Sequence, residues 1–318
     1  MKKLLCALLA WAALAAHGTE FDYRLTPKAV APDVYVFVGK TEDFDTVNGG
    51  NIVNTGFIVG PEGVVVIDTG PSRHYGQQMR EAIRQVTDKP VALVINTHHH
   101  PDHFLGNQAF ADGPIAALAD VQQGIASDGN AFAENLFRMS GDWMKGTEVV
   151  VPTRVLQAGP LTVAGRPLRL LALDGHTAAD LAVLDETSHV LFAGDLVFND
   201  RAPTTPHARI PRWLAALDKL EGVMADASVK VLVPGHGAVT QDAAPIARTR
   251  AWLRWLSETF TQSAAQGLDM PELFALPLPE RFRTLPLAGS EYRGAVVHRF
   301  PGIEAEALQV HFRQEFRH

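Results

Sequence analysis

The sequence predicts an α/β fold with a mostly helical extension at its carboxyl-terminal end. Two observations support this prediction. Short apolar runs rich in β-branched residues alternate with segments of helical spacing up to about residue 240, as is typical of α/β domains. From about residue 241, a long amphipathic segment is followed by a stretch rich in Pro and Leu. We therefore expect one domain over residues 22–240 and a helical extension over 241–318.

The expected strands are apolar runs bounded by Gly, Pro, Asn and Asp, the residues that favour turns. They cover residues 34–39, 51–60, 63–70, 90–96, 113–118 and 230–235. The first three follow one another closely and are expected to form a meander. Residues 161–173 are expected to form a hairpin or two separate strands, and residues 181–194 a hairpin that turns at 186–188.

Four further segments have the spacing of apolar residues that is typical of helices. They cover residues 72–87, 119–145, 211–222 and 244–266. Ser72 is a candidate N-cap for the first of them. Pro211 opens the third, where a missing backbone N–H is tolerated. The second segment contains Gly and Asn residues, at which we expect breaks in the helix.

Residues 1–16 have the form of a cleavable signal peptide. Lys2 and Lys3 give a basic start, an apolar block follows, and Ala13 and Ala15 form an A-x-A pattern. The apolar block is too short for a membrane anchor, and no later run is long enough to span a membrane. We therefore expect an exported protein that is periplasmic or secreted.

Export would also remove the single cysteine of the chain. Cys6 lies in the segment expected to be cleaved, so the mature chain would have no disulfide, thiolate nucleophile or thiolate metal ligand. The formal net charge is −7 at pH 7, and no basic run follows the amino terminus. Because nucleic-acid binding depends on Lys and Arg contacts with phosphates, we expect no nucleic-acid partner.

The densest group of titratable residues, NTHHHPDH, lies at 96–103 and directly follows an expected strand. It holds four of the 13 histidines of the chain. His98, His100 and Asp102 are spaced by two, so their side chains point the same way in an extended segment. Pro101 supports an extended backbone because proline disfavours helix at the residue before it.

Other candidate ligands extend this group. His103, next to Asp102, is expected to point to a second position nearby, whereas His99 should face away. Three more candidates each stand just past an expected strand and are flanked by glycine, which leaves room for tight turns. These are His176, Asp195 and His236.

Together these residues form a set of seven candidate ligands, five His and two Asp. Such a set suits two adjacent metal ions that share one carboxylate. Neutral imidazoles with carboxylates favour two zinc ions, with iron or manganese as alternatives. Taken singly, a His or Asp after a strand is more often a cap or a surface residue, but the spacing of two favours a metal site.

Four motifs in this order resemble the metal-binding motifs of the metallo-β-lactamase superfamily: HHHPDHFLG, GHT, GDLV and GHG. The H-x-H-x-D-H-x-x-G signature is matched in full from His98 to Gly106, and the resemblance covers about residues 30–240. It implies an αββα sandwich of two sheets, with helices outside and the metal ions at one edge.

Two longer stretches, NGGNIVNTGFIVGPEGVVVIDTGP and THHHPDHFLGNQAF, are similar to the quinoprotein relay system zinc metallohydrolases. That similarity implies an association with periplasmic PQQ-dependent alcohol oxidation through a quinoprotein dehydrogenase.

The resemblance also implies a role for each candidate ligand. The first metal ion would be held by His98, His100 and His176. The second would be held by Asp102, His103 and His236. Asp195 would bridge both. Asp68, near the end of VVVIDTG, would orient the loop that carries the ligands without binding a metal ion itself. Asp68 taken alone is also consistent with a turn or helix cap.

The activity implied is hydrolysis by a hydroxide held between two metal ions. Asp102, which would orient the hydroxide, and Asp195 are the candidate catalytic residues, and the expected substrate is a small ester, thioester, lactone or amide. Lactamases with a cysteine ligand are excluded by the composition of the mature chain. The bridging Asp195 makes the chain more similar to general hydrolases, such as glyoxalase II-type thioesterases and lactonases, than to the lactamase subclass that lacks this residue.

Three other functions remain open. The first is a β-lactamase-type hydrolase, and the second is an iron-dependent sulfur dioxygenase, which shares the fold. The third is a non-catalytic partner of a quinoprotein dehydrogenase. The dioxygenases use one iron held by two His and one Asp, and a non-catalytic partner would tolerate ligand loss. The complete ligand set therefore favours a hydrolase.

Other polar and aromatic residues carry weaker indications. The loop at 39–51 is expected to hang over the metal ions, with Phe44 as an apolar contact. The segment at 198–213 offers three polar residues as candidate substrate contacts, although each taken singly is expected to be a solvated loop residue. They are Arg201, His207 and Arg209. Four histidines are expected to be structural or on the surface, namely His74, His189, His298 and His311. Trp252 and Trp255 are expected to lie in the core.

Overall fold

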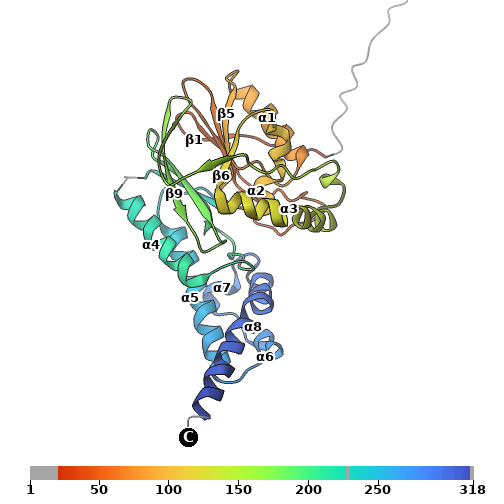
Figure 1. The fold of residues 1–318 in the computed structure, drawn as a ribbon, viewed down its shortest axis with the longest axis vertical. Coiled ribbons are helices and arrows are strands. Elements are labelled where there is room, and N and C mark those ends of the chain that lie inside the picture. Colours follow the sequence, from red (N-terminus) through yellow and green to blue (C-terminus); the bar gives the residue numbers. More distant parts are fainter. Residues whose placement is uncertain (1–20, 227–228, 316–318) are drawn as a thin grey trace, which may run out of the picture.

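The computed structural model describes residues 21–226 and 229–315. The signal peptide expected at 1–16 lies outside these residues. Two β-sheets with helices on their outer faces form the main body, and the helices near the carboxyl-terminal end extend away from one side of it (Figure 1).

The first sheet has seven strands that follow one another in sequence order. They are β1 (Lys28–Ala31), β2 (Val34–Phe37), β3 (Thr55–Val59), β4 (Val64–Ile67), β5 (Val91–Ile95), β6 (Ile115–Leu118) and β7 (Arg154–Leu156). Strands β1 to β4 pair antiparallel, which confirms the expected meander. Strands β4 to β7 pair in parallel, and helices make the connections between them. The connecting helices are α1 (Arg73–Val86), α2 (Pro101–Phe104) and α3 (Ala119–Ser140).

The second sheet has five strands in the order β12-β11-β10-β9-β8. They are β8 (Gly159–Val163), β9 (Arg166–Leu173), β10 (Asp180–Asp185), β11 (Val190–Phe198) and β12 (Val231–His236). Strands β8 to β11 pair antiparallel, so both expected hairpins are present. Strand β12 returns through α4 (Ile210–Asp226) and pairs with β11 in parallel.

The two sheets pack face to face, as the alternation of side chains along each strand requires. Val65 and Ile67 of β4 lie between the sheets, in one cluster with Val183 of β10. Val64 and Val66 point to the other side, where α1 covers them. Helices α4 and α5 (Ala244–Ala265) cover the outer face of the second sheet. The arrangement is the αββα sandwich that the resemblance of the motifs implies.

Helix α1 begins where the sequence predicts. The Ser72 hydroxyl accepts a hydrogen bond from the Tyr75 backbone N–H at 3.1 Å, so Ser72 is the N-cap. Tyr75, Met79 and Ile83 recur at helical spacing and are buried against the first sheet.

The carboxyl-terminal segment is helical and shares a core with the second sheet. Its helices are α5 (Ala244–Ala265), α6 (Met270–Ala275), α7 (Glu280–Arg283) and α8 (Ala288–Glu315). Trp252 is fully buried, and its ring lies 5.1 Å from the rings of both Trp255 and Phe282. Phe300 of α8 belongs to the same cluster as Leu191 of β11. The tryptophan pair therefore packs in the core, as expected. Within the described residues, no helix combines the length and apolar character needed to cross a membrane.

Two details differ from the sequence prediction. Strands β1 and β7 were not expected, because each is a short edge strand with little apolar alternation of its own. Helix α3 runs without a break through Gly124 and Gly129. An added Cβ at these positions would lie 2.8 Å from a side-chain atom of His99 and of Val149 respectively, so the glycines allow close packing.

Candidate metal centre

The NTHHHPDH stretch leaves β5 at its carboxyl end and passes into α2. His100 has an extended backbone, with φ of −78° and ψ of 146°, and Pro101 occupies the first turn of α2. The extended geometry predicted from the spacing of two therefore holds only as far as His100. Asp102 lies in the first turn of α2, so a change of backbone direction, and not strand alternation alone, brings its carboxylate to the centre. His103 follows it on the same short helix, as expected.

The other three candidate ligands come from the second sheet. His176 lies in the connection between β9 and β10, and His236 is the last residue of β12. Asp195 lies within β11, not after it, at a place where the register with β12 is irregular. The neighbouring Gly194 has φ of 53° there, a left-handed conformation that glycine adopts at little cost.

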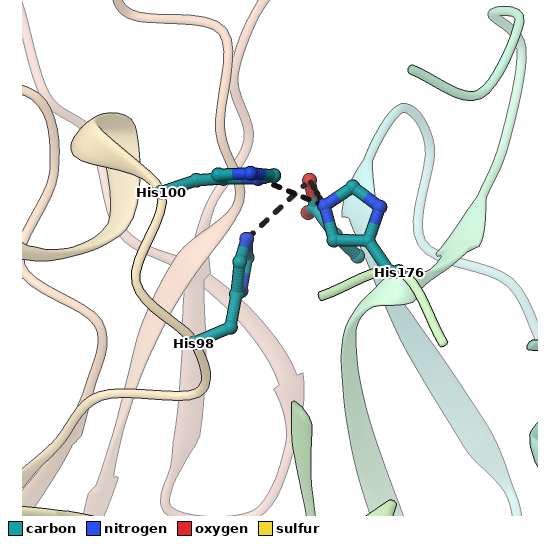
Figure 2. Close-up of side chains that lie close together, drawn as sticks. His98, His100 and His176 are labelled. Atoms are coloured by element: carbon teal, nitrogen blue, oxygen red, sulfur yellow. Dashed lines mark hydrogen bonds and ion pairs between the residues drawn. The ribbon is translucent and has the colours of Figure 1, made fainter. Parts of the chain in front are cut away.

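All seven candidate ligands converge, with the Asp195 carboxylate in the middle. Its Oδ1 lies 3.1 Å from Nε2 of His103. Its Oδ2 lies 3.3 Å from Nε2 of His176 and 3.1 Å from Nε2 of His236. Figure 2 shows the His98, His100 and His176 rings gathered around one point. Nε2 of His98 lies 3.8 Å from Oδ2 of Asp195.

The donor atoms form two adjacent groups, and within each group they lie within 4.8 Å of one another. The first group consists of His98, His100, His176 and Asp195. The second consists of Asp102, His103 and His236. All of these side chains are buried. The grouping matches the two ligand sets that the sequence resemblance implies, with Asp195 positioned between them.

Several polar atoms of the candidate ligands are buried without a hydrogen-bond partner. They include Nε2 of His98, Nε2 of His103 and Oδ1 of Asp195. A buried polar atom left unpaired costs about 1–3 kcal/mol, and a cation held among these atoms would satisfy them together. Imidazole nitrogens and carboxylate oxygens are also the ligands that zinc and similar divalent metals take. The residues therefore fit a metal centre.

The protonation of the histidines depends on where each ring lies. Burial lowers the pKa of His98 and of His100 well below the usual histidine value, and the neighbouring imidazoles add to this effect. These two rings are therefore neutral and have a lone pair available for a metal ion. Burial also acts to lower the pKa of His103, but the carboxylates of Asp195, Asp102 and Asp68 outweigh it and raise that pKa well above its usual range.

The Asp195 carboxylate is held as an anion by its imidazole neighbours. Burial alone would raise the pKa of Asp195, but His236 and His103 lower it well below its usual range. A buried carboxylate that is ionised between two groups of imidazoles attracts cations, since burial weakens the screening of its charge. This electrostatic arrangement favours a divalent metal on either side of Asp195.

Residues behind the ligands fix the orientation of their rings. Asp68 accepts hydrogen bonds from the Thr97 backbone N–H at 2.8 Å and from its hydroxyl at 2.7 Å, and lies 2.8 Å from Nδ1 of His103. Asp68 has φ of 56°, which Asp tolerates better than most residues. Nδ1 of His236 lies 2.8 Å from the Ile52 carbonyl. Asp68 therefore has the supporting contacts expected of it.

Glycine at position 235 is required by the packing around Asp195. An added Cβ would lie 1.9 Å from Oδ1 of Asp195 and 2.8 Å from the backbone of Gly194. Neither distance is possible for real atoms without a shift of the backbone. The GHG motif therefore brings His236 close to Asp195 because its first glycine has no side chain.

A cavity of about 420 Å³ opens next to the ligands. Four of the candidate ligands line it, namely His100, Asp102, Asp195 and His236. One wall is apolar and is formed by Phe44, Ile52, Phe132 and Met139. The loop at 39–51 therefore contributes Phe44, as expected. Four larger hollows, of about 580, 600, 510 and 450 Å³, contain none of these ligands.

Three polar residues that the sequence favoured as solvated, structural or surface residues line the cavity. Arg201 was expected to be solvated, but it is buried, and its Nη2 lies 2.8 Å from Glu291 of α8. His298, also from α8, lines the cavity instead of lying apart from it. His207 is exposed as expected, yet its Nδ1 lies 2.8 Å from Nε2 of His100. No local motif marks these residues, because their contacts join distant parts of the chain.

Comparison with known proteins agrees with this architecture. Residues 48–236 match the family model of the metallo-beta-lactamase superfamily. A linear primary-alkylsulfatase from Pseudomonas sp. is 23% identical over 286 residues, which are 76% of this chain and 53% of that protein. A hydroxyacylglutathione hydrolase from Shewanella oneidensis is 30% identical over 110 residues, or 34% of this chain and 36% of that protein. The chain thus spans about half and about a third of the lengths of these two relatives.

Solved structures show the same fold at low sequence identity. A metallo-beta-lactamase from Pontibacter korlensis is similar with a TM-score of 0.58 and 22% identity, covering 72% of this chain and 99% of that one. A variant of the sec-alkyl sulfatase PisA1 is similar with a TM-score of 0.66 and 17% identity, covering 87% of this chain and 50% of that one. The family model matches more than half of the residues of this chain, and the chain therefore belongs to the metallo-beta-lactamase superfamily.

Proposed function

We propose that the protein is a dinuclear zinc hydrolase that cleaves an uncharged ester, thioester, lactone or amide. The observation that carries the proposal is the position of the Asp195 carboxylate between two groups of buried nitrogen and oxygen donors. His98, His100 and His176 would hold one metal ion. Asp102, His103 and His236 would hold the other, with Asp195 shared between them. Iron and manganese are the alternative metals for such a set of ligands.

Metal ions bound here would lower the pKa of water from about 15.7 to about 7 and so supply a nucleophile at neutral pH. Asp102 lines the cavity, and its carboxylate can accept a hydrogen bond from the attacking water and so orient it. The attack forms a bond to the carbonyl carbon and breaks the bond to the leaving alcohol, thiol or amine. The absence of cysteine from the described residues means that no thiolate nucleophile is available there.

The lining of the cavity supports an uncharged substrate with an apolar part. Phe44, Phe132 and Met139 offer an apolar wall next to the ligands. Arg201 is the only Lys or Arg among the described residues that line the cavity, and Glu291 already pairs with it at 2.8 Å. An anionic substrate would therefore find no unpaired cationic side chain in this cavity.

A sulfate ester is the second candidate substrate. The relative that aligns with 76% of this chain is named a linear primary-alkylsulfatase, and the sec-alkyl sulfatase structure covers 87% of it. The apolar wall would suit an alkyl chain equally well. Because the described lining offers no unpaired Lys or Arg, only the metal ions could balance the charge of a sulfate group, and this favours the uncharged ester as the first candidate.

The test is metal analysis of natively purified protein, followed by assays with a panel of substrates. The panel comprises an aryl ester, a thioester, a lactone, nitrocefin, an alkyl sulfate and a phosphodiester. We expect two zinc ions per chain and turnover of an uncharged carbonyl substrate. Turnover of the alkyl sulfate alone would support the second candidate. One iron per chain without hydrolysis of any substrate would overturn both.

The location of the protein and its association with a quinoprotein dehydrogenase are further proposals. They rest on the signal-like residues 1–16 and on the resemblance of the stretches at residues 48–71 and 97–110. Cell fractionation with amino-terminal sequencing of the mature chain tests export. Recovery of the full-length chain from the cytoplasm would contradict it. Co-purification with a quinoprotein dehydrogenase tests the association.

A further inference from the structure

A histidine outside the ligand set contacts one of the candidate ligands directly. Nε2 of His100 lies 2.8 Å from Nδ1 of His207, which is a hydrogen-bond distance. The other ring nitrogen of His100, Nδ1, lies 2.9 Å from Nε2 of His176. His176 in turn lies 3.3 Å from the Asp195 carboxylate. His100 therefore has one nitrogen on the metal side and the other on the side of His207.

This arrangement sets which nitrogen of each ring carries a proton. A neutral imidazole that offers the Nδ1 lone pair to a metal ion must carry its proton on Nε2. Nε2–H of His100 then donates a hydrogen bond to Nδ1 of His207. Accepting through Nδ1 requires a neutral His207 to carry its own proton on Nε2.

The loop that carries His207 is held in place by its neighbours. The Ala208 backbone N–H donates to the Thr205 carbonyl at 3.1 Å, and Ala208 is fully buried. The Arg209 backbone N–H donates to the Gly175 carbonyl at 2.7 Å. Gly175 precedes the ligand His176, so the two histidines that flank His100 are fixed to each other through the backbone.

Aromatic packing restricts the same pair of rings. The Phe132 ring of α3 meets the His100 ring edge-on, with centroids 6.1 Å apart. It also meets the His207 ring edge-on, with centroids 5.9 Å apart. Phe132 therefore covers the side of the His100–His207 pair and limits the rotation of both rings.

We propose that His207 is a positioning residue, which accepts a hydrogen bond from Nε2–H of His100 and thereby holds the ring in the orientation that presents Nδ1 to the first metal ion. The proposal rests on the proposed metal centre but not on the identity of its substrate. Hydrogen-bond partners of metal-binding histidines typically increase metal affinity by about 10–100-fold.

The donor atoms of His99, His100 and His207 also lie within 4.8 Å of one another, which suggests a third metal site as the alternative. That site would need Nε2 of His100 to be a metal ligand while Nδ1 serves the first ion. His100 would then have to lose both ring protons. A neutral His100 that donates to His207 needs no such deprotonation, so the positioning role is favoured.

The test compares three variants by zinc titration in competition with a chromophoric chelator. His207→Ala removes the acceptor, and we expect the first zinc to bind about 10–100-fold more weakly. His207→Asn places an amide oxygen near the position of Nδ1, so we expect it to restore the wild-type affinity. His298→Ala is the matched control, because His298 lines the same cavity but has no hydrogen bond to a candidate ligand in the described structure. We expect the control to keep the wild-type affinity.

Nitrogen NMR of the zinc-loaded wild type adds a readout that does not depend on activity. We expect His207 to be neutral with its proton on Nε2. Equal zinc affinity of His207→Ala and the wild type would overturn the positioning role while leaving the proposed hydrolase intact. A third zinc that is lost in His207→Ala would replace the positioning role with a metal site. A wild type that binds no metal would overturn both proposals.

Discussion

At the residue scale, histidines only a few positions apart have opposite protonation behaviour. His98 and His100 are surrounded by other imidazoles, and burial lowers the pKa of each. His103 lies between the carboxylates of Asp195, Asp102 and Asp68, which raise its pKa. A metal ion on that side must therefore displace a proton from His103. The binding of metal to the second group should release more protons than its binding to the first.

Asp195 is the residue whose charge we expect to matter most. Asp195→Asn keeps the size of the side chain but removes the anion that lies 3.1–3.3 Å from three imidazole nitrogens. We expect fewer metal ions per chain, and turnover lower by at least about 100-fold, the effect of losing one strong electrostatic group in an active site. Metal analysis and steady-state kinetics check this.

Asp200→Asn is the matched control for Asp195→Asn. Asp200 is exposed and has φ of 55°, a conformation that Asn adopts readily. We expect unchanged metal content and turnover for this variant. If Asp195→Asn retained both metal ions and full turnover, the assignment of a bridging role to Asp195 would be wrong.

At the element scale, the middle of β11 and the end of β12 approach so closely that position 235 has no room for a side chain. Gly235→Ala would place Cβ 1.9 Å from Oδ1 of Asp195. We expect a loss of stability of about 1–3 kcal/mol from overpacking and weaker metal binding, because the Asp195 carboxylate must move. Urea unfolding and zinc titration measure the two effects.

Gly222→Ala is the control for the same type of substitution. Gly222 lies inside α4, and an added Cβ would have no atom within 4 Å. We expect this variant to be more stable by up to about 1 kcal/mol, the difference in helix propensity between Gly and Ala, with unchanged zinc affinity. Similar effects of both substitutions would contradict a specific role for Gly235.

At the scale of the whole molecule, the carboxyl-terminal helices complete the wall of the cavity. Arg201 follows β11, and Glu291 belongs to α8, yet their side chains are 2.8 Å apart. Arg201 also donates to the Glu42 carbonyl at 3.2 Å, in the loop that precedes β3. One guanidinium therefore joins the sandwich, the loop at 39–51 and the helical extension.

We expect the loss of Glu291 alone to be costly. Burial raises the pKa of Glu291, although Arg201 acts to lower it. Glu291→Met would leave the Arg201 charge buried without its partner, which costs about 3–5 kcal/mol when a buried pair is broken. The double variant with Arg201→Met removes both charges and should lose less stability than Glu291→Met. Urea unfolding of the three proteins measures this, and a double variant less stable than Glu291→Met would contradict it.

Metal removal should also act on the whole molecule, because the ligands come from both sheets. His98 and His103 follow β5 of the first sheet, whereas Asp195 and His236 belong to the second. We expect chelation to lower the thermal midpoint of unfolding and zinc to restore it. Zinc at about 100 times its dissociation constant would stabilise the fold by about 2.7 kcal/mol. An unchanged midpoint after complete removal of metal would contradict a metal centre that joins the sheets.

Much of this architecture follows from patterns that are local in the sequence. The apolar runs predict the approximate positions of ten strands. They do so because side-chain alternation and turn residues are features of only a few neighbouring residues in the sequence. Ser72 caps α1 where its spacing predicts. The spacing of the His and Asp residues, with glycine beside them, predicts seven candidate ligands, and the resemblance of the motifs implies the two groups of donors that the structure brings together.

Only the tertiary structure determines what surrounds those ligands. His207 and His100 are 107 residues apart in the chain, and Arg201 and Glu291 are 90 apart. Neither contact leaves a local pattern, because each depends on how the sheets stack and where the helices pack against them. The sequence by itself determined the chemical nature of the ligands and the strands that carry them. The tertiary structure decided which nitrogen of each ring faces the centre and which distant residues close the cavity, because these depend on contacts between elements far apart in the chain.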